Sequence, residues 1–246
     1  MTLLSGVAAL LAWGIGLSLG VIGSGGSILA LPLLVYLLDI PPKTAVAMTM
    51  AIVGTTSMVG SYVHYRRGNF HAKAALLLGS AGVIGAFFGA QLTPLVQQIH
   101  LMRIFASVMV VVGIVMLRSP ALLKGAQCHR VRCLSIGAGV GVLTGFLGVG
   151  GGFLIVPALV ILAGVDAKRA VGASLAIIAV NSGGGLLGQL STVSVDWLLT
   201  LLILVPTLIG MWMGVNLASR VSRDQLRVVF AWSILAVAAG ILSTTV

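Results

Sequence analysis

The sequence predicts an all-α polytopic membrane protein made of two inverted repeats. Hydrophobic residues make up 59% of the chain and charged residues only 7%, and the mean hydropathy is +1.18, so no part of it can fold as an ordinary water-soluble domain. The apolar runs are unbroken over about twenty residues, which is the length of a spanning helix and not the alternating pattern of a β-barrel strand. The chain also repeats itself, because Gly16 to Phe105 align without gaps on Gly141 to Phe230.

This duplication sets the domain boundaries. We expect residues 1–120 to form the first repeat of the transmembrane domain, 121–130 a cytoplasmic linker, and 131–246 the second repeat. The first repeat begins with one apolar stretch, 3–38, which as a single helix would be about 54 Å long against a hydrocarbon core of about 30 Å. It must therefore break, and the glycines between Gly20 and Ser27 predict the place.

Five apolar segments are expected in each repeat: a first helix, its broken or hairpin continuation, and three spanning helices. Asp39 and two prolines end the continuation in the first copy, because proline does not continue a helix. The expected segments are 3–22, 27–38, 44–64, 72–93 and 101–118 in the first repeat, and 131–148, 152–163, 169–190, 196–218 and 226–244 in the second.

The basic residues decide between two topologies. If each glycine break only interrupts one spanning helix, the chain crosses eight times and its fourteen Lys and Arg residues divide seven and seven between the two sides. If each break is a hairpin, twelve fall on one side, namely Arg66, Arg67, Lys73, Arg118, Lys124, Arg130, Arg132, Lys168, Arg169, Arg220, Arg223 and Arg227, and two on the other, Lys43 and Arg103. The positive-inside rule favours the hairpins, which make the repeats inverted and place both termini outside the cytoplasm.

Two glycine clusters are the first candidate binding elements. Gly148, Gly150, Gly151 and Gly152 precede a short apolar run, and Gly23, Ser24, Gly25, Gly26 and Ser27 hold the equivalent place 125 positions earlier. A short helix that starts there offers N–H groups without an intrahelical partner at the positive end of its dipole. Discontinuous helices in inverted repeats are typical of secondary transporters, whose sites lie near the bilayer midplane. The pattern predicts an anion site between the two breaks.

Glycines can instead serve helix packing alone, since small residues let membrane helices approach closely. We interpret six glycines at four-residue spacings in this way: Gly16, Gly20, Gly85, Gly89, Gly210 and Gly214. For the two clusters the packing interpretation stays open beside the anion site.

Neutral polar side chains within the spans are the second group of candidates. They are Thr49, Thr55, Thr56 and Ser57 in the first copy and Ser174, Asn181 and Ser182 in the second, most of them at equivalent positions. Such donors could complete a shell around an anion, with interhelical hydrogen bonding as the alternative. All four acidic residues fall in loops or at segment ends, so a cation site or a carboxylate proton relay lacks its usual parts.

Two pairs of side chains receive a structural interpretation. His64 and His71 flank the Arg66-Arg67 loop, and we interpret them as interfacial rather than catalytic. Cys128 and Cys133 are spaced too widely for a Cys-x-x-Cys motif and have no second pair, which predicts reduced thiols and no metal site.

The duplicated glycine motif with its downstream proline resembles the sulfite exporter TauE/SafE family of bacterial membrane proteins. The resemblance covers nearly the whole chain and is closest in the second copy, at Gly145 to Gly152, Pro157, Asn181-Ser182, Gly184, Asp196-Trp197 and Gly210. The first copy departs from it, with Ser24 and Ser27 flanking only two glycines and His71-Ala72 in place of Asp196-Trp197. The resemblance implies a protein of the bacterial inner membrane that moves sulfite, sulfonates or related sulfur oxyanions.

Together these features predict a secondary transporter for a small anion, working by alternating access without a cofactor. The expected partners are a small inorganic or organosulfur anion and the lipid bilayer, with a homo-oligomer possible and no nucleic acid. An anion channel and a non-transporting accessory subunit remain alternatives; an enzyme would need a nucleophile with its base, or metal ligands, and the spans offer neither. The expected substrate-binding residues are Gly23, Ser24, Gly25, Gly26, Ser27, Thr56, Ser57, Gly148, Gly150, Gly151, Gly152, Asn181 and Ser182.

Overall fold

The chain folds as a bundle of helices in the computed structural model, which describes residues 2–23, 25–118, 130–147, 152–159, 165, 167–217, 228, 232 and 235–241. These residues are helical or lie in turns and contain no strand, which confirms the all-α class. The elements are α1 (Thr2–Ile22), α2 (Gly25–Pro32), the π-helix η1 (Leu33–Leu37), α3 (Pro42–Arg66), α4 (Ala72–Leu92), the 3-10 helix η2 (Thr93–Leu95), α5 (Gln98–Arg118), α6 (Arg130–Leu147), α7 (Gly152–Pro157), α8 (Ala167–Gln189) and α9 (Trp197–Leu217). Ser24, Gly148, Gly150, Gly151 and most of the linker 121–130 lie outside the described residues.

Several of these helices are long and apolar enough to cross a membrane. Among the described residues four qualify by length and hydropathy: Pro42–Arg66, Ala72–Leu95, Arg169–Gln189 and Trp197–Leu217. Shorter apolar helices accompany them at Gly6–Val21, Gly26–Leu37, Ile99–Val111 and Cys133–Leu147. The chain is therefore a multi-pass membrane protein.

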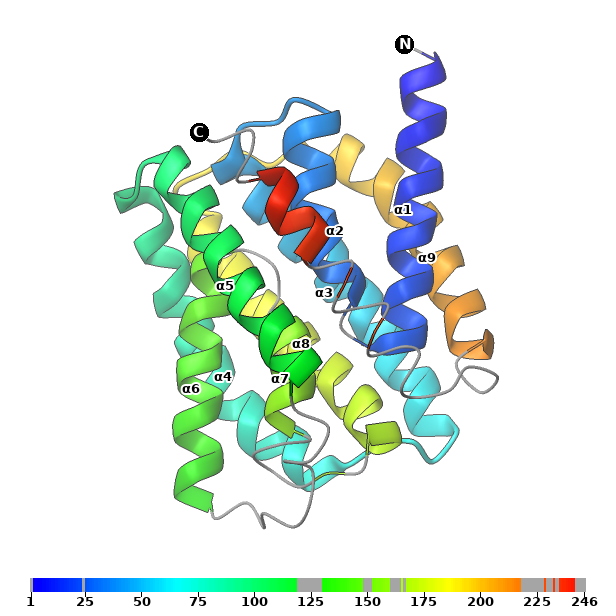
Figure 1. The fold of residues 1–246 in the computed structure, drawn as a ribbon, viewed down its shortest axis with the longest axis vertical. Helices are drawn as coiled ribbons and strands as arrows, with labels where there is room; N and C mark the ends of the chain where they lie inside the picture. Colours follow the sequence, from blue (N-terminus) through cyan, green and yellow to red (C-terminus); the bar gives the residue numbers. More distant parts are fainter. Residues whose placement is uncertain are drawn as a thin grey trace.

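Helices α3 and α8 form the centre of the bundle and run antiparallel. Near the middle of both helices Gly54 lies against the side chain of Ser182, whereas toward the end of α3 the Ser61 hydroxyl lies 3.4 Å from the carbonyl oxygen of Gly172, close to the start of α8. Figure 1 shows α1 and α9 along one edge of the molecule, α4 and α6 along the other, and α3 and α8 between them. Most of the described polar groups inside the bundle therefore belong to α3 and α8.

The two outer helix pairs, α1 with α9 and α4 with α6, are held together by glycines. A Cβ atom added at any of eight glycines would overlap a backbone carbonyl oxygen of the facing helix, so only glycine allows this approach. The contacts recur at an offset of 125 residues: Gly16 with Thr207 and Gly141 with Gly82, Gly20 with Met211 and Gly145 with Ala86, Gly85 with Ala138 and Gly210 with Trp13, and Gly89 with Val142 and Gly214 with Leu17. The packing role expected for Gly16, Gly20, Gly85, Gly89, Gly210 and Gly214 is confirmed, and Gly141 and Gly145 share it.

The chain reverses direction at the first glycine cluster. Gly23 has a φ of +79°, a left-handed conformation that glycine adopts without strain. Beyond it, a Cβ added at Gly26 would overlap the carbonyl oxygen of Ile15, eleven residues earlier, so α2 folds back against α1. A helix that simply continued would carry Gly26 about 16 Å away from Ile15 along the axis.

Basic residues gather at one end of the bundle. Because α3 and α8 are antiparallel, Arg66 and Arg67 at the end of α3 lie at the same end as Arg169 near the start of α8. Lys43 starts α3 at the opposite end, where its ammonium group donates a 2.9 Å hydrogen bond to the carbonyl oxygen of Pro94.

Cys133 differs from its sequence interpretation, because it is disulfide-bonded in the structure. The prediction of reduced thiols was therefore wrong for this residue. Residue spacing was a poor guide, since it does not record which sulfur atoms come together in the fold.

Candidate functional site

The first glycine break packs against the second turn of α8. Gly23 lies against Val171, and the hydroxyl of Ser174 lies 3.5 Å from the carbonyl oxygen of Gly23 while donating a shorter bond, 2.7 Å, to the carbonyl of Val171. Gly23 and Ser174 are buried. The break is thus held by the second repeat, more than a hundred residues away in sequence.

The residues that follow this break begin the short helix α2 and pack closely against α1. Gly25 begins α2, and the close contact of Gly26 with Ile15 leaves no space on that side for a ligand. Ser27 is fully buried. In the second repeat Gly152 begins α7, which contacts both α2 and α8. The two short helices that follow the breaks therefore meet, as the alignment of the repeats implies.

The most unusual polar groups belong to the two central helices, α3 and α8. Thr49, Ser57, Asn181 and Ser182 are each at most 1% exposed. The hydroxyl oxygens of Thr49, Ser57 and Ser182, and both the nitrogen and the oxygen of the Asn181 amide, have no hydrogen-bond partner within the described part of the chain. Leaving one buried donor or acceptor unpaired costs about 1–3 kcal/mol, so this group needs an explanation other than stability.

Asn181 is the clearest member of this group. Its amide lies directly against Gly82 of α4, where an added Cβ would come within 2.9 Å of the amide nitrogen. A carboxamide can donate two hydrogen bonds and accept two, and none is made inside the protein as described. Gly82 thus leaves room for the amide and supplies no partner for it.

Thr56 behaves differently from its neighbour Ser57. The Thr56 hydroxyl donates a 2.7 Å hydrogen bond to the carbonyl oxygen of Ile52, one turn earlier in α3. Its hydrogen is therefore already used inside the helix, whereas the Ser57 hydroxyl has no partner among the described residues. Thr56 was expected to bind substrate, but its hydroxyl is satisfied inside α3.

The structure separates the candidate residues into two groups. Ser174 faces the first break, and Ser182 lies eight residues farther along α8, about 12 Å along the helix axis. The central group is Ser57, Asn181 and Ser182, and the break group is Gly23, Gly25, Gly26 and Ser27. An anion of a few atoms cannot touch both groups at once in this conformation.

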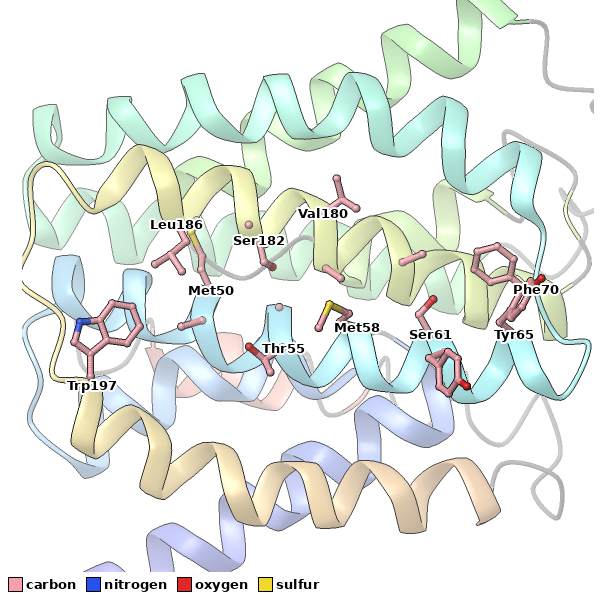
Figure 2. Close-up of a pocket in the computed structure, with 16 residues that line it drawn as sticks. Met50, Thr55, Met58, Ser61, Tyr65, Phe70, Val180, Ser182, Leu186 and Trp197 are labelled. Carbon is pink, nitrogen blue, oxygen red and sulfur yellow. The ribbon is translucent and has the colours of Figure 1, made fainter.

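A cavity of about 600 Å³ opens between α3 and α8 beside the central group. Figure 2 shows Trp197 at one end of it, Tyr65 and Phe70 at the other, and Ser182 and Met58 between them. Ser182 is the member of the central group that lines this cavity. The walls are mainly apolar, and in this conformation the Ser182 hydroxyl lies behind them without accessible surface.

The chemistry offered by the central group is that of neutral hydrogen-bond donors. Asp39 and Asp196, the two acidic residues that the structure describes, are exposed at helix boundaries. Hydroxyl and amide groups that can donate, without a carboxylate beside them, suit an anion better than a cation.

Three side chains near the helix ends were not singled out for function by sequence reasoning. His64, interpreted as interfacial, is in fact buried at 4% exposure. Gln189 donates a 3.2 Å bond to the carbonyl of Ala90, and Arg67 donates a 2.8 Å bond to the carbonyl of Val215. Ala90 and Val215 are 125 residues apart, so the two acceptors occupy equivalent places in the repeats. Aligning the repeats beyond the glycines could have revealed this pairing.

Comparison with known proteins gives a consistent result. The family described as sulfite exporter TauE/SafE matches residues 8–241. A probable membrane transporter protein of Xylella fastidiosa (strain 9a5c) is 32% identical over 240 residues, covering 91% of this chain and 89% of that protein. The probable membrane transporter protein YdhB of Bacillus subtilis is 31% identical over 220 residues, covering 87% of this chain and 90% of that protein. The archaeal protein MJ0441 of Methanocaldococcus jannaschii, also a probable membrane transporter protein, is 25% identical over 238 residues, which is 88% of this chain and 89% of its own length.

No solved structure matches the chain. The family match spans nearly the whole sequence, including both glycine clusters and the central helices that carry the unpartnered polar side chains. The chain therefore belongs to the sulfite exporter TauE/SafE family of membrane transporters.

Proposed function

We propose that this chain is a secondary transporter for a small sulfur oxyanion, such as sulfite or a sulfonate. The observation that carries the proposal is the Asn181 amide, buried with neither its nitrogen nor its oxygen paired among the described residues. The description of the family as a sulfite exporter supports this substrate class. An oxyanion would accept hydrogen bonds from Asn181, Ser57 and Ser182, and these bonds would offset the free energy that burying the unpaired groups costs.

Alternating access is the mechanism that we propose for this site. The outer pairs α1–α9 and α4–α6 are locked by glycine contacts and would each move as a unit. The short helices α2 and α7 meet between the repeats and would open the central group first to one side and then to the other. The break group would receive the anion on its way to or from the central group, about 12 Å away.

We also propose the inverted five-plus-five arrangement, in the inner membrane of a bacterium with both termini outside the cytoplasm. The return of α2 along α1, and the basic residues gathered at one end of α3 and α8, support it. The disulfide at Cys133 points the other way, because disulfides rarely persist in the cytoplasm. Labelling of single cysteines introduced at positions 66–73 and at both chain ends tests this topology. Chain ends that are protected from an external reagent would contradict it.

A flux experiment tests the function itself. Purified protein in liposomes would be loaded in turn with sulfite, sulfate, thiosulfate and methanesulfonate, under imposed proton and sodium gradients. We expect saturable counterflow of labelled anion, in which unlabelled anion inside accelerates uptake from outside. Flux that follows the membrane potential without counterflow would identify a channel instead. No flux with any of the four anions would favour an accessory subunit.

A further inference from the structure

His64 is a buried titratable side chain beside the first glycine break. It belongs to the last turns of α3 and is 4% exposed. Its Nε2 atom lies 3.4 Å from the carbonyl oxygen of Gly20, in the last turn of α1 before the break. Its Cβ atom also lies against Gly172, in the same turn of α8 that holds Gly23. The imidazole therefore joins three elements at the point where the first helix breaks.

The hydrogen-bonding pattern fixes the tautomer of the neutral ring. A carbonyl oxygen only accepts, so the contact with Gly20 requires the proton on Nε2. The other nitrogen, Nδ1, is then a lone-pair acceptor, and it is buried with no partner among the residues described. Adding a proton at Nδ1 breaks no bond, and it turns an unpaired acceptor into a positively charged donor that an anion can accept from.

The charged side chains that the structure describes around His64 are positive. Arg67, at the end of the same helix, acts on the ring electrostatically. α1 (Thr2–Ile22) contains no titratable side chain, and neither does α9 (Trp197–Leu217), to which Arg67 is bonded. On α8 the charged residue described nearest to the contact is Arg169, which is exposed. A carboxylate is therefore missing from the described surroundings, and an anionic ligand is the counter-charge that a protonated ring would select.

The internal duplication supplies a reference for this position. His64 corresponds to Gln189, 125 residues later. Gln189 is also fully buried near a helix end, donates to the carbonyl of Ala90, and has a side-chain oxygen with no partner in the described structure. Both side chains thus lie close to a backbone carbonyl and keep a second polar atom without a partner in the described structure, and of the two only the histidine can gain a proton.

We propose that His64 binds the proton that moves with the anion, so that the chain is a proton–anion symporter. Protonation of Nδ1 supplies the positive charge that the anion needs as it passes the first break, and release of the anion lets the ring lose the proton. This inference rests on the proposed anion transport. It assigns the coupling ion and the residue that carries it.

Proteoliposomes separate coupling from transport. The probe is labelled methanesulfonate, which stays anionic over about pH 5–8, the range in which histidine titrates. We expect the parent protein to accumulate it several-fold above equilibrium when the outside is acidic. His64→Gln should fall to the equilibrium level, and the counterflow that it retains should no longer change with pH, because glutamine cannot gain a proton. His100→Gln, an exposed histidine in α5, is the matched control and should accumulate the anion like the parent.

Each outcome has one meaning. If the parent exchanges anion but a proton gradient does not drive accumulation, this inference fails and the proposed function stands. If no anion exchanges at all, both fail. If His64→Gln still accumulates methanesulfonate like the parent, another group carries the proton.

A second measurement covers the case in which His64→Gln does not insert. Calorimetric titration of the parent with methanesulfonate, in two buffers with different ionisation heats near neutral pH, reports protons taken up on binding. We expect uptake in the parent and in His71→Gln, His100→Gln and His129→Gln. Zero uptake in the parent, or uptake that disappears in any of these three variants, overturns the assignment to His64.

Discussion

The outer helix pairs and the central pair of this bundle solve opposite problems. In α1–α9 and α4–α6, glycines bring two backbones together so closely that even a methyl group would overlap the facing carbonyl oxygen. Between α3 and α8 the contact is made by side chains, and several of the polar ones have no partner in the described structure. The outer pairs make their contacts within the protein, whereas several described polar groups of the centre do not.

This difference separates a glycine that packs against a facing helix from one that makes no such contact. Eight packing glycines meet backbone of the facing helix at equivalent positions in both repeats, while Gly14 and Gly139, on the same helices α1 and α6, have no atom within 4 Å of an added Cβ. In a membrane, where lipid supplies little drive for helix association, such contacts carry the cohesion of the bundle. Unpaired polar groups add none, so they are better explained by a ligand.

The largest expected effect comes from filling a packing glycine. Gly141→Ala places its Cβ onto the carbonyl oxygen of Gly82 and must force α4 and α6 apart, so we expect loss of folded protein or a loss of stability of about 1–3 kcal/mol or more. Gly16→Ala should do the same to α1 and α9. The measurement is the yield and melting temperature of purified protein in detergent.

The matched controls lie two residues away. Gly139→Ala and Gly14→Ala enter open space, so their melting temperatures should stay at or slightly above that of the parent. Equal damage from Gly139→Ala and Gly141→Ala would mean that sequence position in α6, and not contact with α4, decides the effect.

The next effect concerns the central amide. Asn181→Leu keeps a similar shape and removes every polar atom, so we expect anion affinity to fall about five- to 150-fold, which corresponds to about 1–3 kcal/mol. The stability of the anion-free protein should not fall, because the amide makes no bond in the described structure. Anion-induced shifts of the melting temperature measure both quantities in one series.

A different result would change the interpretation of Asn181. If Asn181→Leu melts well below the parent without anion, the amide holds helices together as an interhelical hydrogen bond. The centre of the bundle would then resemble the outer pairs, because its polar groups would also hold helices together.

The smallest and sharpest effect comes from two adjacent hydroxyls. Ser57→Ala removes an unpaired donor and should weaken anion-induced stabilisation, whereas Thr56→Ala removes a donor already bonded to Ile52 and should change it less than about threefold. Because the residues are neighbours on α3, differences in expression or insertion are largely controlled. Equal losses of anion-induced stabilisation would contradict a binding role for the free Ser57 hydroxyl.

Much of the fold could be predicted from the residues alone. Composition and unbroken apolar runs identified an all-helical membrane protein. The 36-residue apolar stretch 3–38 is too long for one span, so its length predicted a break in the first helix. Four-residue glycine spacing predicted packing at Gly89 and Gly214, since a helix returns to the same face after about one turn. These features are local or periodic, and a linear sequence records them directly.

What the sequence left open is which residues face one another. Ser174, Asn181 and Ser182 appeared equivalent as polar positions in one helix, but the crossing of α8 with its neighbours turns Ser174 toward the first break and Asn181 toward Gly82. His64 appeared interfacial because it precedes two arginines, yet the end of α1 and the second turn of α8 cover it. These partners come from segments as much as about 150 residues apart, and their meeting depends on how whole helices rotate and cross, which composition, periodicity and spacing do not record.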